Sequence, residues 1–403
     1  MKFSKLSQLL LVSAVGLILA TLLTACQLVT IDYVFVTCSA GSSAGSSGEI
    51  YVYAVDSESG ALRTGASTVA SGGTGPIAMA TTSDYYNLYV ANQGSKNVVH
   101  FSVSDHGVLT QKDVVTLPAA PVSVAVNAAN TYLYVVSGTS SATLTEYPLS
   151  SGAIGSATAT LSLTVPGYTT DTIVPTGVTV LANSSAVYVT AYDKSAYNPG
   201  GSTTSNANPG WLFGYSVGTG GALTPVSGSP DQAGVKPSAL ATDPASRFIY
   251  VTDFASNQLI GYTVLASDSL QFMVNGPFKT GNQPTAVTID PRGIYIYLSN
   301  SLDSTVSAYS ISLPTGAPST VVSTSGSAAN ATDTQPVSIV VDPALGRFVY
   351  TANYVGNSIS GFRLDPNTGT LSQTQATPYP TGANPTFVIS VPHGNHSIQA
   401  VID

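Results

Sequence analysis

Residues 236–244 read KPSALATDP and lead to FIYVTD at 248–253. A short apolar run follows the proline, Asp-Pro makes a turn, and a Tyr-Val strand returns. The same order recurs as QPVSIVVDP at 335–343 and FVYTAN at 348–353. A pair of strands joined by a tight turn is therefore the unit that decides the fold, and it is repeated.

The unit recurs along almost the whole chain. Its opening proline stands at Pro76, Pro121, Pro175, Pro237, Pro284, Pro336 and Pro385, and the tyrosine of its second strand at Tyr89, Tyr134, Tyr188, Tyr250, Tyr297 and Tyr350. A third strand alternates, as in IYVYAV at 50–55, and ends in a glycine-bearing turn such as DSESGAL at 56–62, before an outermost strand. Copies spaced by roughly 45 to 60 residues match the size of a four-stranded blade.

The two ends of the chain complement each other. Residues 31–70 supply the later strands of a blade, whereas 384–391 supply a first strand without later ones. Joining them closes a ring and leaves no long sheet edge exposed. We therefore predict an all-β fold, a seven-bladed β-propeller of four-stranded antiparallel blades, with the N- and C-terminal strands sharing one blade. Residues 33–37 and 396–402 compete for the second strand of that blade, and the sequence leaves the choice open.

The first 25 residues are typical of an export signal. Lys2 and Lys5 precede an apolar run at 9–23, and LTAC at 23–26 resembles a lipobox. In bacterial lipoproteins with that pattern the cysteine is acylated and becomes the new N-terminus. This implies lipidation of Cys26, a tether at 26–30 and a propeller domain at 31–403. Gln27 favours the outer membrane or cell surface, and the periplasmic face stays open. An ordinary signal peptide or an uncut anchor helix is the alternative.

The composition narrows the function. Only 8% of the residues are charged and the formal net charge is −8, which argues against a nucleic-acid partner. Cys38 is the only cysteine besides Cys26, so an intramolecular disulfide is not expected to hold the domain together. We predict no cofactor and no metal, and we expect a monomer attached to the membrane through its lipid.

Polar residues follow the second strand in five units, where we expect them to surround the mouth of the central channel. They are Asn92, Asp193, Asp253, Asn300 and Asn353. An insertion between two strands adds Lys194, Tyr197 and, at its end, Trp211, and these suit a sugar or peptide surface. Loop capping by Asn and Asp is the alternative for the polar positions. Tolerance of a long loop is the alternative for the insertion.

The repeats resemble the YVTN-repeat and lactonase-like, 6-phosphogluconolactonase-like, seven-bladed propellers over about residues 31–400. YVTD at 250–253 is one letter from the signature of the former. The resemblance implies the propeller fold and a lactone hydrolase activity. Members of the latter group carry an Arg-His pair and a later His in a middle blade, and an Asn-Glu after the Tyr-Val strand. Here the matching positions hold Ser238, Ala239 and Thr242, and Asp253 with Phe254, so the resemblance supports the fold more strongly than the activity.

Several other patterns are explained by turn chemistry. GSSAG at 41–45 matches a nucleophile elbow but lies in a loop between two strands. The turns that begin at Asp56 and Asp365 lack the late glutamate of a calcium loop. His393 and His396 are too loosely placed for a metal site. Structural pairing is expected in the turns that contain Asp243 and Arg247, Asp290 and Arg292, and Asp342 and Arg347.

Two functions follow from these patterns. We expect a cell-envelope module that binds or scaffolds an envelope glycan, protein or small ligand. The alternative is a lactone hydrolase in which Asp193 or Asp253 activates water as a general base. The chain has only 12 Lys and Arg residues, which makes a phosphorylated lactone a poor substrate.

Overall fold

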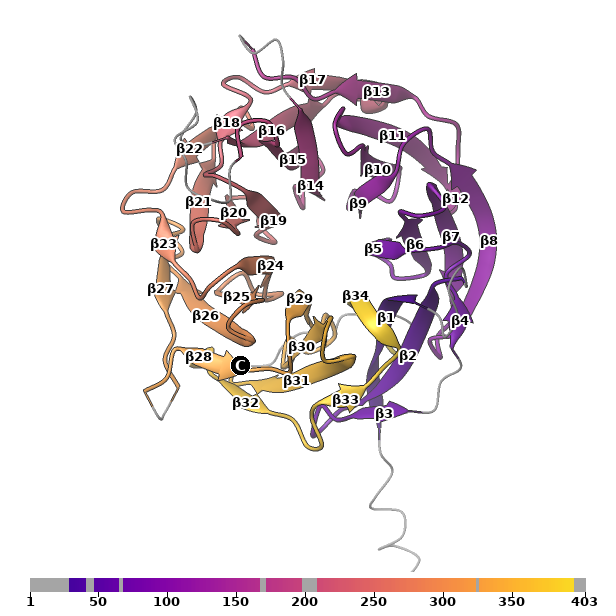
Figure 1. Ribbon diagram of the computed structural model, residues 1–403, viewed down its shortest axis with the longest axis vertical. Helices are drawn as coiled ribbons and strands as arrows, with labels where there is room; N and C mark the ends of the chain where they lie inside the picture. Colours follow the sequence, from indigo (N-terminus) through magenta and orange to yellow (C-terminus); the bar gives the residue numbers. More distant parts are fainter. Residues whose placement is uncertain are drawn as a thin grey trace, which may run out of the picture.

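The computed structural model describes residues 29–40, 47–64, 68–166, 172–197, 209–323 and 326–394. In this part of the chain, seven antiparallel sheets stand around one axis like the blades of a propeller (Figure 1). Its single helical element is the 3-10 turn η1 (Thr219–Gly221), and none of its helices is long and apolar enough to span a bilayer. The predicted signal sequence, Cys26 and the GSSAG loop at 41–45 lie outside the described residues.

We number the blades along the chain and describe each from the channel outwards. Blade 1 contains β34 (Ala383–Pro392), β1 (Thr30–Ala40), β2 (Glu49–Asp56), β3 (Leu62–Thr64) and β4 (Val69–Ala70). Blade 2 contains β5 (Pro76–Thr81), β6 (Asn87–Asn92), β7 (Asn97–Val103) and β8 (Leu109–Thr116). Blade 3 contains β9 (Pro121–Val126), β10 (Tyr132–Ser137), β11 (Thr143–Ser150), β12 (Ala153–Ile154) and β13 (Ala159–Ser162).

The other four blades repeat this arrangement. Blade 4 contains β14 (Ile173–Val180), β15 (Ala186–Asp193), β16 (Gly210–Val217), β17 (Leu223–Pro225) and β18 (Asp231–Gln232). Blade 5 contains β19 (Pro237–Thr242), β20 (Phe248–Asp253), β21 (Gln258–Val264), β22 (Leu270–Phe272) and β23 (Phe278–Lys279). Blade 6 contains β24 (Pro284–Ile289), β25 (Tyr295–Asn300), β26 (Thr305–Ile311), β27 (Pro318–Thr320) and β28 (Ala329–Ala331). Blade 7 contains β29 (Pro336–Val341), β30 (Phe348–Asn353), β31 (Ser358–Leu364), β32 (Leu371–Gln373) and β33 (Tyr379–Pro380).

The outermost strand is the least regular part of each blade. In blade 5, for example, β22 and β23 both pair with β21, so they are two pieces of one interrupted fourth strand. The outer strands are exposed along much of their length, as in β22 and β27, so little apolar packing keeps them continuous. The prediction of seven four-stranded antiparallel blades is confirmed, with the fourth strand split in every described blade except blade 2.

The ring closes within blade 1. Strand β1 lies between β34 and β2, and Tyr33 is opposite both Val391 and Ala54. The two ends of the described chain therefore share one blade, as predicted (Figure 1). Residues 33–37 fill the place of the second strand, and residues 396–402 lie outside the described part.

The hydrophobic core is distributed between the blades. Each pair of neighbouring blades encloses a cluster of buried side chains; between blades 7 and 1, for example, Phe348 and Tyr350 pack with Val34 and Val36. Burial of this apolar surface is what favours stacking of the repeats, since one blade alone leaves both of its faces exposed. The closing contact is thus built in the same way as the other contacts between blades.

The repeated tyrosines carry a second link between blades. Their rings are fully buried, and in five of them the hydroxyl group donates to a backbone carbonyl in the outer turn of the next blade. The pairs are Tyr89 with Gly152, Tyr188 with Asp268, Tyr250 with Gly316, Tyr297 with Gly369, and Tyr350 with Gly60. In four of these five contacts the acceptor is a glycine of the outer turn, so the recurrence of Tyr and of that glycine is explained by the joining of neighbouring blades.

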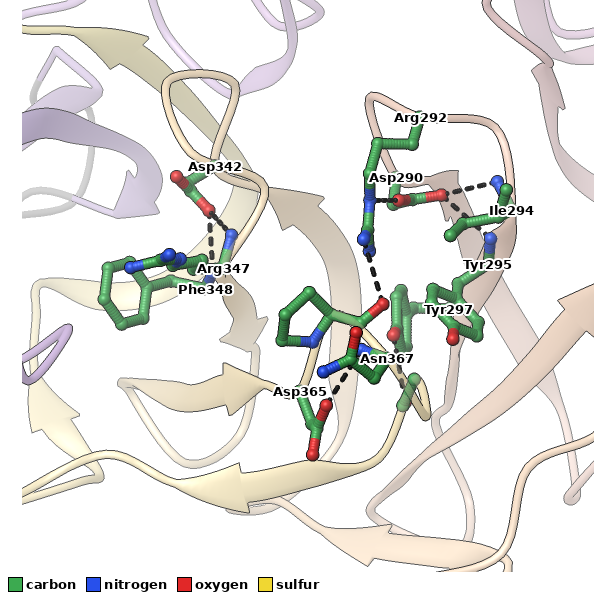
Figure 2. A network of polar contacts seen from close by, with 12 residues as sticks. Asp290, Arg292, Ile294, Tyr295, Tyr297, Asp342, Arg347, Phe348, Asp365 and Asn367 are labelled. Atoms are coloured by element: carbon green, nitrogen blue, oxygen red, sulfur yellow. Dashed lines mark hydrogen bonds and ion pairs between the residues drawn. The ribbon is translucent and has the colours of Figure 1, made fainter. Parts of the chain in front are cut away.

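The turns between first and second strands lie on the face opposite the cavity described below. Asp290 accepts hydrogen bonds from the N–H groups of Ile294 and Tyr295 and pairs with Arg292 at 2.8 Å, and Arg292 also donates to the carbonyl of Pro366 in blade 7 (Figure 2). The equivalent Asp243 pairs with Arg247 at 2.8 Å. The predicted structural pairing is confirmed for these two turns.

Blade 7 departs from this pattern. Asp342 binds the backbone N–H groups of Arg347 and Phe348, whereas the Arg347 side chain is exposed (Figure 2). The ionisable side chain beside Asp342 is instead Asp32 of β1, which is also fully buried. Burial, followed by the charge of Asp342, raises the pKa of Asp32 well above its usual range. Two carboxyl groups thus meet where the first and last blades join.

Candidate functional site

The first strands of all seven blades surround a cavity of about 470 Å³ on the axis of the ring. Each strand contributes residues that directly follow its opening proline, such as Ser238 in β19 and Thr285 in β24. Tyr354, the residue after β30, also lines the cavity and is 36% exposed. The cavity therefore lies toward the face that carries the turns between second and third strands. Its size is that of a small-molecule site.

Hydroxyl groups on the cavity wall join neighbouring blades. Three of them donate to the carbonyl of the opening proline in the next blade: Ser238 to Pro284 at 2.7 Å, Thr285 to Pro336 at 2.9 Å, and Thr386 to Pro76 at 2.8 Å. Most other lining side chains are aliphatic, as at Val122, Leu240 and Val337. The wall is therefore neutral, with hydroxyl groups set in an apolar surface.

Two further serines on the wall are bound differently. The Ser338 Oγ atom accepts a hydrogen bond from the N–H of Val388 at 3.1 Å, and the Ser123 Oγ atom accepts one from the N–H of Val178 at 3.4 Å. Accepting from a backbone N–H leaves the hydroxyl hydrogen of each serine able to donate. Each of these hydroxyl groups, one in blade 3 and one in blade 7, could donate to a ligand oxygen within the cavity.

The three predicted asparagines are buried at the ends of the second strands of their blades. Asn353, for example, donates to the hydroxyl groups of Ser358 and Ser360 at 3.0 Å each. Asn92 donates to Asn97 Oδ1 in its own blade and to the Ser71 carbonyl in the connection from blade 1. Asn300 donates to the hydroxyl groups of Thr305 and Ser307 in its own blade. None of the three lines the cavity.

The two predicted aspartates are also buried. Asp253 accepts from the N–H groups of Val235 and Lys236, at 2.9 Å each, and from the side chain of Gln258 at 3.1 Å. Asp193 accepts from the hydroxyl and N–H groups of Ser195, at 2.6 and 2.9 Å. Neither carboxylate lines the cavity; each fixes the backbone of a turn at its rim.

The residues predicted from the insertion lie in three different surroundings. Lys194 is exposed, whereas Trp211 is buried in the core between blades 3 and 4. Tyr197 is partly buried and meets the ring of Tyr192 edge-on, with 5.6 Å between the ring centroids. Only Tyr197 takes part in the cluster at the rim described next.

Sequence reasoning missed Lys236. Its ammonium group lies 5.5, 5.1 and 4.8 Å from the ring centroids of Tyr192, Tyr197 and Phe254. We call these four residues the lysine cluster. A signal was present: the residues before the seven opening prolines are Gly75, Ala120, Val174, Lys236, Gln283, Gln335 and Asn384, and only Lys236 is charged. The aromatic partners, however, come from two blades.

The minor motifs are engaged in local contacts. The Asp56 Oδ1 atom accepts from the N–H and hydroxyl groups of Ser59 at 2.9 and 2.7 Å, as turn chemistry predicts. The His393 ring lies 5.7 Å from that of Tyr33, and His396 is outside the described residues. Within the described ranges, no three His, Cys, Asp or Glu side chains gather closely enough to hold a metal ion.

Comparison with known proteins agrees with this geometry. The family model described as "Lactonase, 7-bladed beta-propeller" matches residues 33–396. No protein of curated function matches the sequence significantly. The periplasmic gluconolactonase of Pseudomonas aeruginosa superposes with a TM-score of 0.73 at 16% sequence identity, over 92% of this chain and 100% of that one.

Two other solved structures are similar. A candidate 6-phosphogluconolactonase from Bacteroides uniformis gives a TM-score of 0.71 at 18% identity, over 90% of this chain and 99% of that one. A protein from Lactobacillus plantarum gives 0.69 at 16% identity, over 90% and 100%. At such low sequence identities, these similarities show only that the fold is shared.

Proposed function

We propose, from the premise that the chain belongs to the seven-bladed β-propeller lactonase family, that it hydrolyses an uncharged lactone in its central cavity. The observation that carries the proposal is the cavity of about 470 Å³, with its neutral wall and with Tyr354 at its rim. The similar fold of the P. aeruginosa gluconolactonase supports a lactone as the substrate class. A phosphorylated lactone is disfavoured, because such a wall does not compensate the charge of a phosphate.

The reaction consists of a single hydrolysis. Water adds to the ester carbonyl, the ring C–O bond breaks, and a proton reaches the released alkoxide, giving a hydroxy acid. Ser338 in blade 7 and Ser123 in blade 3 lie on different sides of the cavity, so either one is the proposed donor to the carbonyl oxygen, where negative charge develops. The apolar residues beside them suit the carbon atoms of the ring.

The candidates for the general base are still Asp193 and Asp253, which lie at the rim and do not line the cavity. Each already accepts hydrogen bonds from backbone N–H groups, so activation of water requires one of these bonds to be exchanged. Asn in place of either aspartate keeps the shape of the side chain. A hydrolysis rate that is unchanged in both Asp193→Asn and Asp253→Asn would remove this assignment.

A binding module without turnover is the second candidate. The observation that favours it is that the cavity wall consists of aliphatic and hydroxyl side chains with Tyr354 and Phe387, which are groups that recognise a ligand. The envelope glycan, protein or small ligand expected from the sequence would meet the same face. Binding of intact lactone without release of acid would favour this function.

The test is a panel of uncharged lactones of different ring size, followed by acid release at constant pH. Val337→Trp places a large ring at a partly buried position of the wall and should lower kcat/KM at least about tenfold, because the substrate loses its space. Val114→Trp, on β8 with 46% exposure, is the matched control and should retain the rate. No acid release by the wild type on any lactone would reject the proposal.

We also propose that the domain is anchored to the cell envelope by lipid on Cys26, as the N-terminal sequence predicts. The described structure begins at residue 29, so the support is the sequence pattern. Labelling with a radioactive fatty acid should mark the wild type and leave Cys26→Ala unlabelled. Equal labelling of the two would contradict the proposal.

A further inference from the structure

The lysine cluster is the feature that the proposed reaction leaves unused. Tyr192 ends the second strand of blade 4, Tyr197 follows it, and Phe254 follows the second strand of blade 5. Lys236 lies directly before Pro237, which opens β19. The cluster therefore spans the junction of two blades on the cavity side of the ring, because Tyr354, at the position in blade 7 equivalent to Phe254, lines the cavity.

The backbone around the lysine is held in place. The Phe254 N–H donates to the Lys236 carbonyl at 2.9 Å, and Asp253 accepts from the Lys236 N–H at 2.9 Å. On the other side, the Tyr197 N–H donates to the Asp193 carbonyl at 3.0 Å. Asp253 and Asp193 are thus positioning residues for the lysine and for one of its aromatic partners.

Within the part of the chain that the structure describes, the ammonium group has attractive neighbours but no ionic partner. Aromatic faces attract a cation through their quadrupole, and they accept no conventional hydrogen bond from its three N–H donors. Among the described residues, the contacts between basic and carboxylate side chains involve His100, Arg247 and Arg292, and none involves Lys236. Partial burial lowers the pKa of Lys236. A chain with a net charge of −8 thus keeps a fixed, partly buried cation unpaired by carboxylate in its described part.

The cluster lies close to the cavity wall along the chain, although none of its four residues lines the cavity. Ser238, two residues after Lys236, lines the wall, and Pro237 between them is part of the same strand. A ligand that occupies the cavity with its apolar part can therefore extend a charged end toward Lys236. An anion there would gain a charge-assisted hydrogen bond, which is stronger than a bond between neutral groups.

We propose that the lysine cluster is a carboxylate-binding site at the mouth of the channel, and that its ligand is an open-chain hydroxy acid. The choice of hydroxy acid rests on the proposed function, because ring opening of a lactone produces that group. The aromatic rings restrain the side chain before binding, so that less conformational entropy is lost on complex formation. The same site distinguishes the acid from the neutral lactone.

Calorimetric titration of the full chain tests the proposal with two acids and their uncharged counterparts. The acids are gluconate and 6-hydroxyhexanoate, and the matched neutral probes are sorbitol and 1,6-hexanediol. We expect at least one acid to bind the wild type at least about tenfold more tightly than its neutral counterpart, with affinity that falls as salt is added. Failure of both acids to exceed their counterparts would overturn the proposal.

Variants assign the effect to the lysine. Lys236→Met keeps the length of the side chain without the charge and should weaken binding of that acid about tenfold, while Lys236→Arg should retain most of it. Lys279→Met, at an exposed lysine of β23 in the same blade, is the matched control and should bind as the wild type. Equal losses in Lys236→Met and Lys279→Met, or no loss in Lys236→Met, would overturn the assignment.

The result separates the site from the reaction. Lysine-dependent binding of an acid in a protein that hydrolyses no lactone would support the site and reject the proposed function. Lactone hydrolysis together with acid binding that does not change in Lys236→Met would do the reverse.

Discussion

Neighbouring blades are joined by contacts that recur around the ring, whereas the lysine cluster occurs once, between blades 4 and 5. A buried tyrosine that donates to the outer turn of the next blade appears at five junctions, including the closing one through Tyr350 and Gly60. Lys236, by contrast, has no charged counterpart before the other opening prolines. The repeated contacts stabilise the ring, and the lysine cluster, which is not repeated, is the candidate site.

The largest loss of stability is expected from a substitution at the closing junction, between blades 7 and 1. Gly60 has φ +68°, and a Cβ atom there would collide with the ring of Phe348, so Gly60→Ala should lower the free energy of unfolding by about 2 to 5 kcal/mol. Gly220, with φ +70° and open space around it, is the matched control and should cost only about 1 to 2 kcal/mol when changed to Ala. Urea denaturation measures both, and equal losses would contradict the role given to Phe348.

A smaller effect is expected when one tyrosine hydroxyl group is removed, and it compares the closing junction with an internal junction. Tyr350 donates to Gly60 at 2.8 Å and Tyr250 donates to Gly316 at 2.6 Å. Tyr350→Phe and Tyr250→Phe should therefore each lower the free energy of unfolding by about 1 to 2 kcal/mol, since each leaves a buried carbonyl without its donor. A much larger loss for Tyr350→Phe would show that closure depends on this bond more than the internal junctions do.

The carboxyl pair at the closure should make the free energy of unfolding depend on pH. The raised pKa of Asp32 means that this group favours the folded state at low pH, below the pKa of about 4 in the unfolded chain. That contribution is lost as the pH rises through the folded-state pKa. The unfolding free energy of the wild type, relative to Asp32→Asn, should therefore fall as the pH rises above about 4. Denaturation at several pH values measures the difference, and an increase with pH would contradict the assignment.

The smallest expected effect concerns the lysine cluster. Cation–π contacts of a partly exposed lysine contribute modestly, so Lys236→Met should change the free energy of unfolding by less than about 1 kcal/mol. The same variant is expected to weaken acid binding, which separates a ligand contact from a structural one. A loss as large as that of Gly60→Ala would instead place Lys236 among the contacts that hold the ring together.

Much of the fold was predictable because each repeat carries its own strands and turns. The opening prolines, the Tyr-Val strands and the glycine-bearing turns each appear several times, and a repeated signal is reliable even where single copies are weak. The choice of residues 33–37 for the second strand of blade 1 was not predictable, because both candidate segments contain several apolar residues that suit a strand.

The residues of the candidate site stay a prediction, and the structure shows how their side chains are engaged. Asp193 and Asp253 were correctly assigned to equivalent positions after their second strands, yet their carboxylates turn toward backbone N–H groups of their own surroundings. Lys236 was overlooked because its ring neighbours Tyr192 and Phe254 are separated from it in sequence and belong to different blades. Such a contact depends on how two blades stack.

The sequence by itself determined the blade, the number of blades and the meeting of the two ends, because these follow from strand periodicity and turn residues within each repeat. Only the tertiary structure decided which hydroxyl groups join blades, which carboxyl groups face each other and which aromatic rings surround Lys236. Those properties arise between repeats, where distances are set by the packing of one blade against the next.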